Sequence, residues 1–439
     1  MTVDLRWLWS RINANYWFYP ALFSLVSVAL AFALIQADRM GAAEWLNDVT
    51  VIVPARPDGA ANMLTVIAGS MIGVASTVFS ITIAAVVYAS GTYGPRILTN
   101  FMEDRGNQLS LATFIGTFVY AITVLRTVRA EDEVPANLGE AVATTLPGFV
   151  PQLSLLVAYL LMALSVAVLV YFLNHIPSSI HINTVLKEIG QRLLEDIADN
   201  YPQDHDGGEP APAPDGTPLR TERTGYVQLI DFHELEQVAQ SAGCTIALQV
   251  RTGDFVHPGM AMIRLCDGAA GDDFEAATRN AFTLGATRTA TQDPQFLIDE
   301  LVEIGLRALS PAMNDPFTAI TAIHWLGAAT AELGRRDLKR RCEDHPDGRR
   351  VHPLPDTYRH FLGRGFGAMR SAVATSPISA LIMLDALRTA AAPVHDPERV
   401  RMLRDEGGRL MEQTRLALGG PDLADIEQRY ASFLEAFEV

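Results

Sequence analysis

The stretch MLTVIAGSMIGVASTVFSITIAAVVYA, residues 63–89, contains no charged side chain and is long enough to cross a membrane. About 20 consecutive apolar residues are sufficient for a helix to span the hydrocarbon core of a bilayer. Three other stretches of this kind occur, and the four predicted spans run approximately over residues 17–35, 63–89, 109–125 and 153–173. The sequence therefore predicts a four-helix transmembrane domain over residues 1–175.

The composition of the chain excludes nucleic acid as a partner and indicates a reducing compartment. The chain has 439 residues and a formal net charge of −16, whereas nucleic-acid binding requires a basic surface. Its three cysteines, Cys244, Cys266 and Cys342, form neither a close pair nor an even framework, which is typical of reducing surroundings. We therefore expect the region after the spans to lie in the cytoplasm.

The basic residues near the span ends indicate the orientation in the membrane. An even number of spans places both termini on one side, where the flanks carry Arg6, Arg11, Arg96, Arg105, Lys187 and Arg192. The flanks on the other side carry Arg39, Arg56, Arg126 and Arg129. Because cytoplasmic flanks have the excess of Lys and Arg, this bias predicts a multi-pass protein of the bacterial inner (plasma) membrane with both termini in the cytoplasm.

The sequence after the last span predicts a soluble α+β domain. Residues 176–200 have the pattern of an amphipathic juxtamembrane helix, and residues 201–222 form a linker rich in Pro and Gly. A small β module is predicted over residues 223–271, followed by a mainly helical region over residues 272–439. The predicted fold class is thus a membrane α-helical domain followed by a cytoplasmic α+β domain with a small β module and a helical bundle.

The motifs of several common enzyme classes are missing from the sequence. It contains no GxxxxGK[ST] phosphate-binding loop and no HExxH zinc motif, and its histidines are spaced too loosely to indicate a metal. Lys187 and Lys339 are the only lysines, and neither has the apolar setting that a Schiff-base lysine requires. We therefore expect no cofactor, no metal site and no enzymatic activity.

The stretch RALSPAMNDPFTAI, residues 307–320, contains the specific pattern ALSPxxNDPxTA. Together with the four spans and RTATQDPQF, residues 288–296, it resembles a bacterial family known only as predicted membrane proteins of unknown function. The resemblance covers most of the chain and implies a shared fold. It implies no activity, cofactor or catalytic residue.

Two interpretations of this pattern stay open. In the structural interpretation, Ser310-Pro311 ends one helix, Asn314 lies in the turn, and Asp315-Pro316 begins the next helix. In the functional interpretation, polar side chains contact a ligand or another subunit, and the candidates are Arg288, Asp293, Arg307, Asn314 and Asp315.

Small and hydroxylated residues share one face of the second span. On a helical wheel at about 100° per residue they occupy a narrow arc. The predicted pore-lining residues are Thr65, Gly69, Gly73, Ser76, Thr77 and Ser80, and the predicted hydrophobic gate is Ile83 and Val87. The same pattern is typical of close helix packing, for which the third span offers a face with Thr113, Gly116, Thr117 and Tyr120.

A basic run, RRDLKRR, occupies residues 335–341. Such a run is either a solvated helix end or a surface for anionic lipid headgroups. In the second case the contact residues are Arg335, Arg336, Lys339, Arg340 and Arg341.

These observations favour a homo-oligomeric channel-like protein in contact with the lipid bilayer. In this hypothesis the second span lines a pathway for ions or small solutes, and the cytoplasmic domain regulates or assembles it. The alternative is a non-conducting scaffold or sensor whose cytoplasmic domain binds a partner or ligand. A membrane-bound enzyme is a third hypothesis, and it requires a polar pocket around Arg288, Asp293, Arg307 and Asp315.

Overall fold

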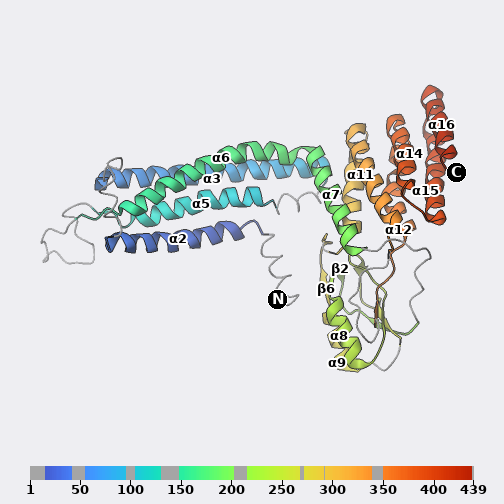
Figure 1. Cartoon of the computed structure of the whole chain (residues 1–439), viewed down its shortest axis with the longest axis horizontal. Coiled ribbons are helices and arrows are strands. Elements are labelled where there is room, and N and C mark those ends of the chain that lie inside the picture. The colour runs from blue at the N-terminus through green and yellow to red at the C-terminus, as the bar shows by residue number, and fades with distance from the viewer. Residues whose placement is uncertain are drawn as a thin grey trace. The chain divides into compact units, whose positions relative to one another are not determined.

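The structure of the protein is a computed structural model that describes residues 15–41, 55–94, 104–129, 148–201, 215–266, 271–290, 292–338 and 350–437. The chain divides into two units, Met1–His181 and Ile182–Val439 (Figure 1). Most of the predicted linker, residues 202–214, lies outside the described residues, as do Lys339, Arg340 and Arg341 of the basic run.

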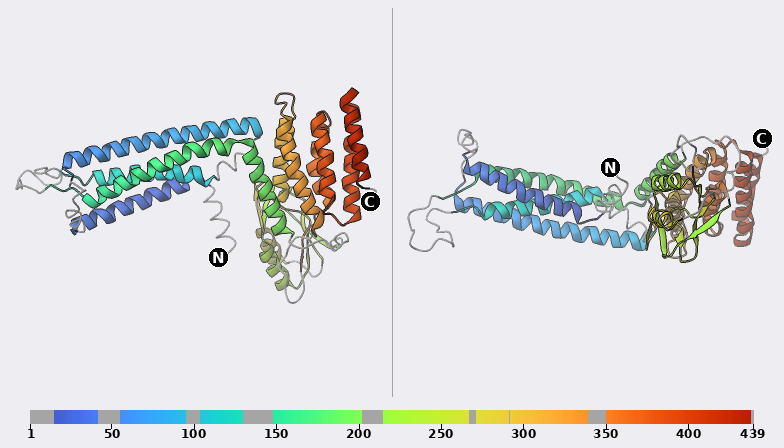
Figure 2. Two further views of the ribbon diagram at one scale, coloured as in Figure 1. Left: turned by 45° about the horizontal axis from the view of Figure 1, so that its top comes forward. Right: turned by 90° about the horizontal axis from the view of Figure 1, so that it is seen from below.

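Four long helices make up the described part of the first unit. They are α2 (Phe18–Arg39), α3 (Pro57–Tyr93), α5 (Arg105–Leu125) and α6 (Gln152–Ile180). Each has the length and apolar composition needed to cross a membrane, which confirms the prediction of four apolar helices. Figure 2 shows them side by side in two views.

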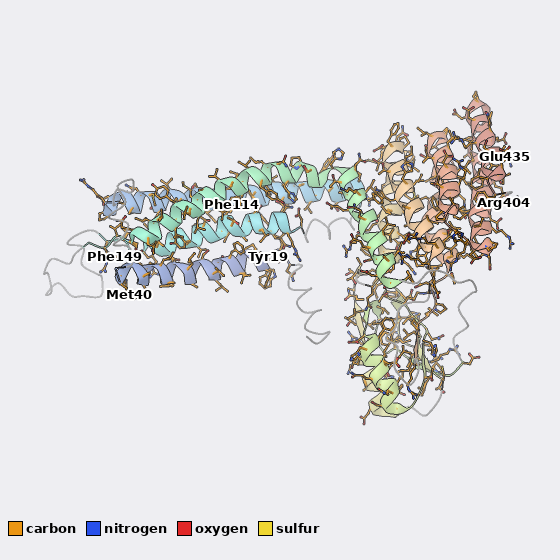
Figure 3. The ribbon with its side chains drawn as sticks, in the orientation of Figure 1. Tyr19, Met40, Phe114, Phe149, Arg404 and Glu435 are labelled. Atoms are coloured by element: carbon orange, nitrogen blue, oxygen red, sulfur yellow. The ribbon has the colours of Figure 1, made fainter. Side chains whose placement is uncertain are left out.

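Helix α5 lies at the centre of this bundle. It contacts α2, α3 and α6, and its side chains Phe114 and Tyr120 are fully buried. Figure 3 marks Phe114 among the helices. Small residues of α5, such as Gly116, let a neighbouring helix approach closely, because a Cβ there would lie only 3.0 Å from Ser27 Oγ of α2.

Helix α3 is longer than a membrane crossing requires. Its 37 residues correspond to about 55 Å at 1.5 Å per residue, compared with a hydrocarbon core of about 30 Å. The helix begins with Pro57 in its first turn, where proline is tolerated, and it ends before Gly94, whose φ is 130°. Part of α3 must therefore project beyond the hydrocarbon or tilt within it.

The second unit combines short strands with helices, as the predicted α+β class requires. Its β region contains β1 (Thr217–Arg220), β2 (Gly225–Ile230), α8 (Phe232–Ala242), β3 (Ile246–Leu248), β4 (Phe255–Val256), β5 (Ala261–Leu265), α9 (Asp272–Asn280), β6 (Phe282–Gly285) and β7 (Val351–His352). Its other helices are α7 (Ile182–Asn200), α10 (Pro294–Ala308), α11 (Pro316–Arg335), α12 (Tyr358–Leu362), the π-helical turn η3 (Gly363–Gly367), α13 (Ala368–Val373), α14 (Pro377–Ala391), α15 (Pro397–Ala417) and α16 (Gly420–Glu435).

The strands form two sheets that extend beyond the predicted β module. One sheet has the order β1-β5-β3-β7 and the other β4-β2-β6. Strand β1 falls within the segment 201–222 predicted as linker, and β6 and β7 follow the predicted limit at residue 271. These strands have two to four residues each and are defined by pairing with distant partners, for which short sequence windows carry little signal.

The helices of the second unit pack mainly in a row. Helix α11 packs against α7, α10 and α14, and α14 packs against α15 and α16. Helix α7 is amphipathic and buries Leu186, Ile189, Leu193 and Ile197. This burial makes α7 part of the second unit's core, so the helix that follows the last span is built into the fold of that unit.

Candidate functional site

The predicted pore-lining face of α3 is uncovered in the structure. Helix α3 buries a face that includes Leu64, Ile67, Met71, Ala75 and Val78, and this face packs into the bundle core. The predicted pore-lining and gate residues lie on the exposed side and are Thr65, Gly69, Gly73, Ser76, Thr77, Ser80, Ile83 and Val87. This face of α3, called the stripe below, therefore points away from the other described helices of its own chain.

Within the described part of one chain, the stripe does not pack against the third span, which was the alternative to pore lining. A Cβ added at Gly69 or Gly73 would meet no heavy atom within 4 Å, so no other part of the described chain approaches these glycines. The third-span face instead packs on α2 and α6. Thr117 Oγ1 lies 3.0 Å from Ser165 Oγ of α6, and the Tyr120 hydroxyl donates to the carbonyl of Ser154 at 3.0 Å.

The hydroxyl groups of the stripe are bonded to the backbone of their own helix. Thr65, Ser76 and Ser80 donate to the carbonyls four residues earlier, at 2.8 to 2.9 Å, and Thr77 donates to that of Gly73 at 3.0 Å. Each donor is therefore satisfied inside the helix, which makes the face tolerable in lipid. Each oxygen keeps acceptor capacity for water, a solute or a neighbouring helix.

Asp38 joins two helices at one end of the bundle. It lies in the last turn of α2 and accepts hydrogen bonds from the backbone N–H groups of Leu153 and Ser154, at 2.9 and 3.0 Å, and from Ser154 Oγ at 2.7 Å. These N–H groups belong to the first turn of α6, which has no internal partners for them. Asp38 thus caps a helix other than its own, a contact that the sequence pattern did not reveal.

Asp104 and His175 join two helices at the opposite end. Asp104 caps α5 by accepting from Gly106 N at 2.8 Å, and its other oxygen lies 2.7 Å from His175 Nε2 of α6. His175 falls just beyond the predicted fourth span, so inspection of the span interiors did not find it. An acid next to one span and a histidine next to another is the signal that could have indicated this pair.

The ALSPxxNDPxTA stretch forms the connection between α10 and α11. Asn314 has a φ of 48°, a left-handed conformation that asparagine tolerates, and the Asp315 carboxylate accepts from Thr318 N at 3.2 Å and Thr318 Oγ1 at 2.6 Å. Arg307 forms an ion pair with Glu303 at 3.5 Å within α10. These contacts are those of the structural interpretation, and a ligand role stays a prediction.

Arg288 and Asp293 meet in a buried charged cluster. Arg288 Nη2 lies 2.5 Å from Asp293 Oδ2, and its Nη1 lies 2.5 Å from Asp299, which also accepts from Arg364 Nε at 2.6 Å. Burial lowers the pKa of the Arg288 guanidinium, but the charges and hydrogen bonds of Asp293 and Asp299 outweigh it and leave that pKa raised. Arg288 is therefore held in its charged form by these two carboxylates.

This charged cluster fixes the β region to the start of α10. A Cβ at Gly253, whose φ is 90°, would collide with Asp293 Oδ2, so the turn between β3 and β4 approaches the cluster as only glycine allows. Asp293 precedes α10 and Asp315 follows it, and the 15 residues of α10, which lie between them, correspond to about 22 Å. The structure therefore does not bring the five polar candidates together in one site.

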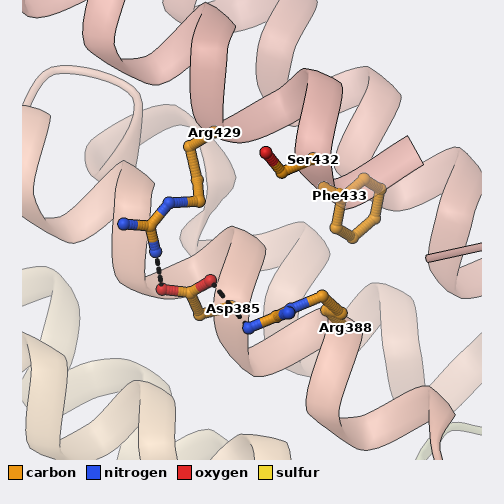
Figure 4. A pocket seen from close by; sticks show the side chains of 5 residues that line it. All are labelled: Asp385, Arg388, Arg429, Ser432 and Phe433. Carbon is orange, nitrogen blue, oxygen red and sulfur yellow. Dashed lines mark hydrogen bonds and ion pairs between the residues drawn. The ribbon is translucent and has the colours of Figure 1, made fainter. Parts of the chain in front are cut away.

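An open pocket lies between α14 and α16. Asp385 forms ion pairs with Arg429 and, at 3.5 Å, with Arg388, and Ser432 and Phe433 complete the lining (Figure 4). Both arginines are about half exposed, which makes these pairs surface interactions of small energy. Among the described residues, no group of three or more His, Cys, Asp and Glu side chains is placed to hold a metal ion.

Comparison with known proteins gives a family and relatives. A family described as "Predicted membrane protein (DUF2254)" matches residues 13–389. Proteins from Mycobacterium bovis and Mycobacterium tuberculosis are each 30% identical over 374 residues, which cover 82% of this chain and 68% of theirs, and both are described as uncharacterized. No solved structure matches the chain.

Proposed function

The chain belongs to the DUF2254 family of predicted membrane proteins, and we propose that this member is a homo-oligomeric channel-like protein without enzymatic activity. In the proposal, copies of α3 surround a pathway for ions or small solutes. The second unit regulates or assembles the pathway. The observation that carries the proposal is the exposed face of α3, whose small and hydroxylated residues are covered by none of the helices that the structure describes.

The spacing of this face supports contact between copies of α3. The exposed positions Gly69, Gly73, Ser76, Ser80, Ile83 and Val87 alternate in steps of four and three residues. This is the repeat by which parallel helices wind around each other, and glycine and serine allow the backbones to approach closely in lipid. Helices that meet along such a seam surround a common axis, so the contact face can also line the pathway.

The gate prediction has support from the position of the apolar residues. Ile83 and Val87 continue the hydroxylated face toward the end of α3, and Val87 is 66% exposed in the single chain. A ring of such side chains around an axis closes a narrow pore by excluding water. Thr65, Ser76, Thr77 and Ser80 offer oxygen acceptors along the remaining length.

The proposal places the protein in the inner membrane with both termini in the cytoplasm, on the charge bias of the span flanks. It does not include contact of the basic run with anionic headgroups. Arg335 and Arg336 are both held by Glu332, at 2.9 and 2.5 Å, which favours a helix end with internal ion pairs.

Cysteine cross-linking tests whether the α3 faces meet. The three native cysteines, Cys244, Cys266 and Cys342, are first replaced by serine or alanine, and Ser76→Cys or Ser80→Cys is then introduced. We expect cross-linked dimers for both variants in membranes. Leu160→Cys, on an exposed position of α6, is the matched control and should cross-link far less. Equal yields at all three positions would contradict an interface through α3.

Flux through liposomes tests conduction. Wild-type protein should pass ions or small solutes, and Val87→Ser should increase the leak because it replaces an apolar gate residue with a polar one. Ala75→Ser, on the buried face of α3, is the control and should leave the flux unchanged. If Ser76→Cys cross-links and all liposomes stay tight under varied voltage and tension, the protein is a scaffold and the channel proposal fails.

A further inference from the structure

Helices α7 and α11 lie parallel and in a fixed register. A Cβ at Gly190 of α7 would meet the ring of Trp325 of α11, and Tyr201, just after α7, accepts from Arg336 Nη1 at 2.7 Å. Gly190 and Tyr201 are eleven residues apart, as are Trp325 and Arg336. Ile182, the first residue of α7, therefore lies beside Phe317, at the start of α11, at the same position along the two parallel helix axes.

Helix α14 runs in the same direction as α11. A Cβ at Gly327 would lie 3.4 Å from Ala386 Cβ, and Gly334, later in α11, lies against Val394, which follows α14. The order of the contacts is the same along both helices. The beginning of α14, including Ile378, is thus at the same end of the row as the beginning of α11.

Helix α15 returns in the opposite direction. Near its start, Arg399 donates to the carbonyls of Leu333, at 3.2 Å, and Arg336, at 2.7 Å, both at the end of α11. Its last turn, which contains Leu416, is therefore again at the end of the row where α11 begins.

Exposed apolar side chains gather at this end. We call them the apolar rim, and they are Leu306, Met313, Phe317, Ile378 and Leu416. In the described part of Ile182–Val439 the other large apolar side chain that is exposed is Phe255. Phe317 is 69% exposed and Leu416 83%, and a group of large exposed apolar side chains marks an interaction surface.

Chain continuity limits the distance between the start of α11 and the end of the last span. The fourth membrane-spanning segment ends at Ser178, and the four residues to Ile182 can extend over at most about 14 Å. Packed helices such as α7 and α11 have axes about 8–10 Å apart, so the start of α11 lies within roughly 25 Å of the end of the span. Phe317, at the start of α11, is thus on the part of the second unit that the short connection from Ser178 to Ile182 keeps within a limited distance of the last span.

We propose that the apolar rim inserts into the boundary between headgroups and acyl chains of the bilayer, with Met313 and Phe317 as the leading residues. Aromatic and apolar side chains at this boundary add membrane affinity in proportion to the apolar area they bury. The ALSPxxNDPxTA turn would then have a second role, since its left-handed Asn314 and its cap Asp315 hold Met313 and Phe317 outward. This proposal does not rest on channel activity or on oligomerisation.

Lipid-borne quenchers test this proposal in the full chain. Phe317→Cys, Met313→Cys and Arg335→Cys are introduced into the cysteine-free protein, labelled with a polarity-sensitive fluorophore, and reconstituted in nanodiscs that contain nitroxide-labelled lipids. Arg335 is the control because it lies 18 residues further along α11, about 27 Å from Phe317. We expect lipid nitroxides to quench the labels at residues 313 and 317 several-fold more than the label at 335.

Two results would overturn the proposal. Equal lipid quenching at residues 317 and 335 would show that the apolar rim has no preference for the bilayer. Weak quenching at residues 313 and 317 by both lipid nitroxides and a water-soluble quencher would show that protein, such as a second copy of the chain, covers the rim.

Discussion

The close approach of Gly190 to Trp325 predicts the effect of a single added methyl group. In Gly190→Ala the new Cβ would have three ring atoms of Trp325 within 2.7 Å, and carbon atoms in proteins do not approach this closely. Either the indole leaves its position or α7 and α11 separate. Gly190 is buried and Trp325 is partly buried, and the close atoms include Cγ and Cδ2, the part of the indole ring next to the backbone of α11, so a small rotation of the side chain does not relieve the strain.

Two opposing terms set the magnitude. Alanine is favoured over glycine in a helix by about 1 kcal/mol, whereas overpacking a core position costs about 1–3 kcal/mol. Because three atoms of a rigid ring are involved, we take the upper half of that range and expect a net loss of about 1–2 kcal/mol. For a unit of this size, that loss corresponds to a fall in Tm of about 2–8 °C. Gly363→Ala is the control, since a Cβ there meets nothing within 4 Å.

In the full chain, the fluorescence of Trp325 reports unfolding of the second unit once the other tryptophans are replaced. The other tryptophans, Trp7, Trp9, Trp17 and Trp45, precede that unit and are replaced by phenylalanine. Thermal unfolding is then followed at the contact itself. If Gly190→Ala is more stable than the wild type, as helix propensity alone requires, the packing of α7 on α11 is wrong. The position of Phe317 beside the start of α7, from which the location of the apolar rim was inferred, would then also lose its support.

Three other contacts give predictions of known sign. Asp38→Ala removes the cap of α6 and should lower the free energy of unfolding in detergent by about 1–2 kcal/mol, as measured by thermal unfolding. Ser154→Ala should have a smaller effect, because it removes only the bond from Ser154 Oγ. Asp299→Ala leaves Arg288 and Arg364 without their shared carboxylate and should lower the free energy of unfolding by about 2–4 kcal/mol. This is less than for a fully buried ion pair because the Arg364 side chain is 31% exposed. An unchanged Tm would contradict this prediction. Burial raises the pKa of Asp196 from 3.8 to about 6. The protonated carboxyl is the form that the folded state favours, so its contribution to the free energy of unfolding is fully present below pH 3.8 and is lost as the pH rises through about 6. In the wild type, the free energy of unfolding should therefore fall by about 1–2 kcal/mol from this group between about pH 4 and pH 7. Asp196→Asn, which cannot titrate, should not show this fall, and thermal scans at a series of pH values would detect the difference.

The spans and the α3 face could be predicted because they depend on local patterns. A span requires only length and an apolar composition, and α2, α3, α5 and α6 all satisfy both. The positions of Thr65 and Ser80 on one side of a helix follow from its period of 3.6 residues. Likewise, the Asp315-Pro316 pair starts α11 as predicted, because an N-cap involves only neighbouring residues.

Contacts between distant segments could not be predicted in the same way. The cap from Asp38 to Ser154 crosses 116 residues, and no local pattern indicates which helix end receives the carboxylate. Gly116 has the small-residue pattern of the α3 stripe, yet it packs on α2 because α5 is central in the bundle. Which helix is central depends on the whole arrangement, so the sequence could indicate the packing faces without their partners.

The α3 face and the apolar rim differ in the environment that suits them. The α3 face has small residues and hydroxyl groups already bonded to the backbone, so it buries little apolar area and favours close contact with another helix. The apolar rim has large side chains and no small-residue repeat, and it favours a fluid apolar phase that adapts to irregular shapes. For these reasons the two proposals assign a second copy of the chain to α3 and lipid to Phe317 and its neighbours. Because the two surfaces belong to different units, each assignment can fail without affecting the other.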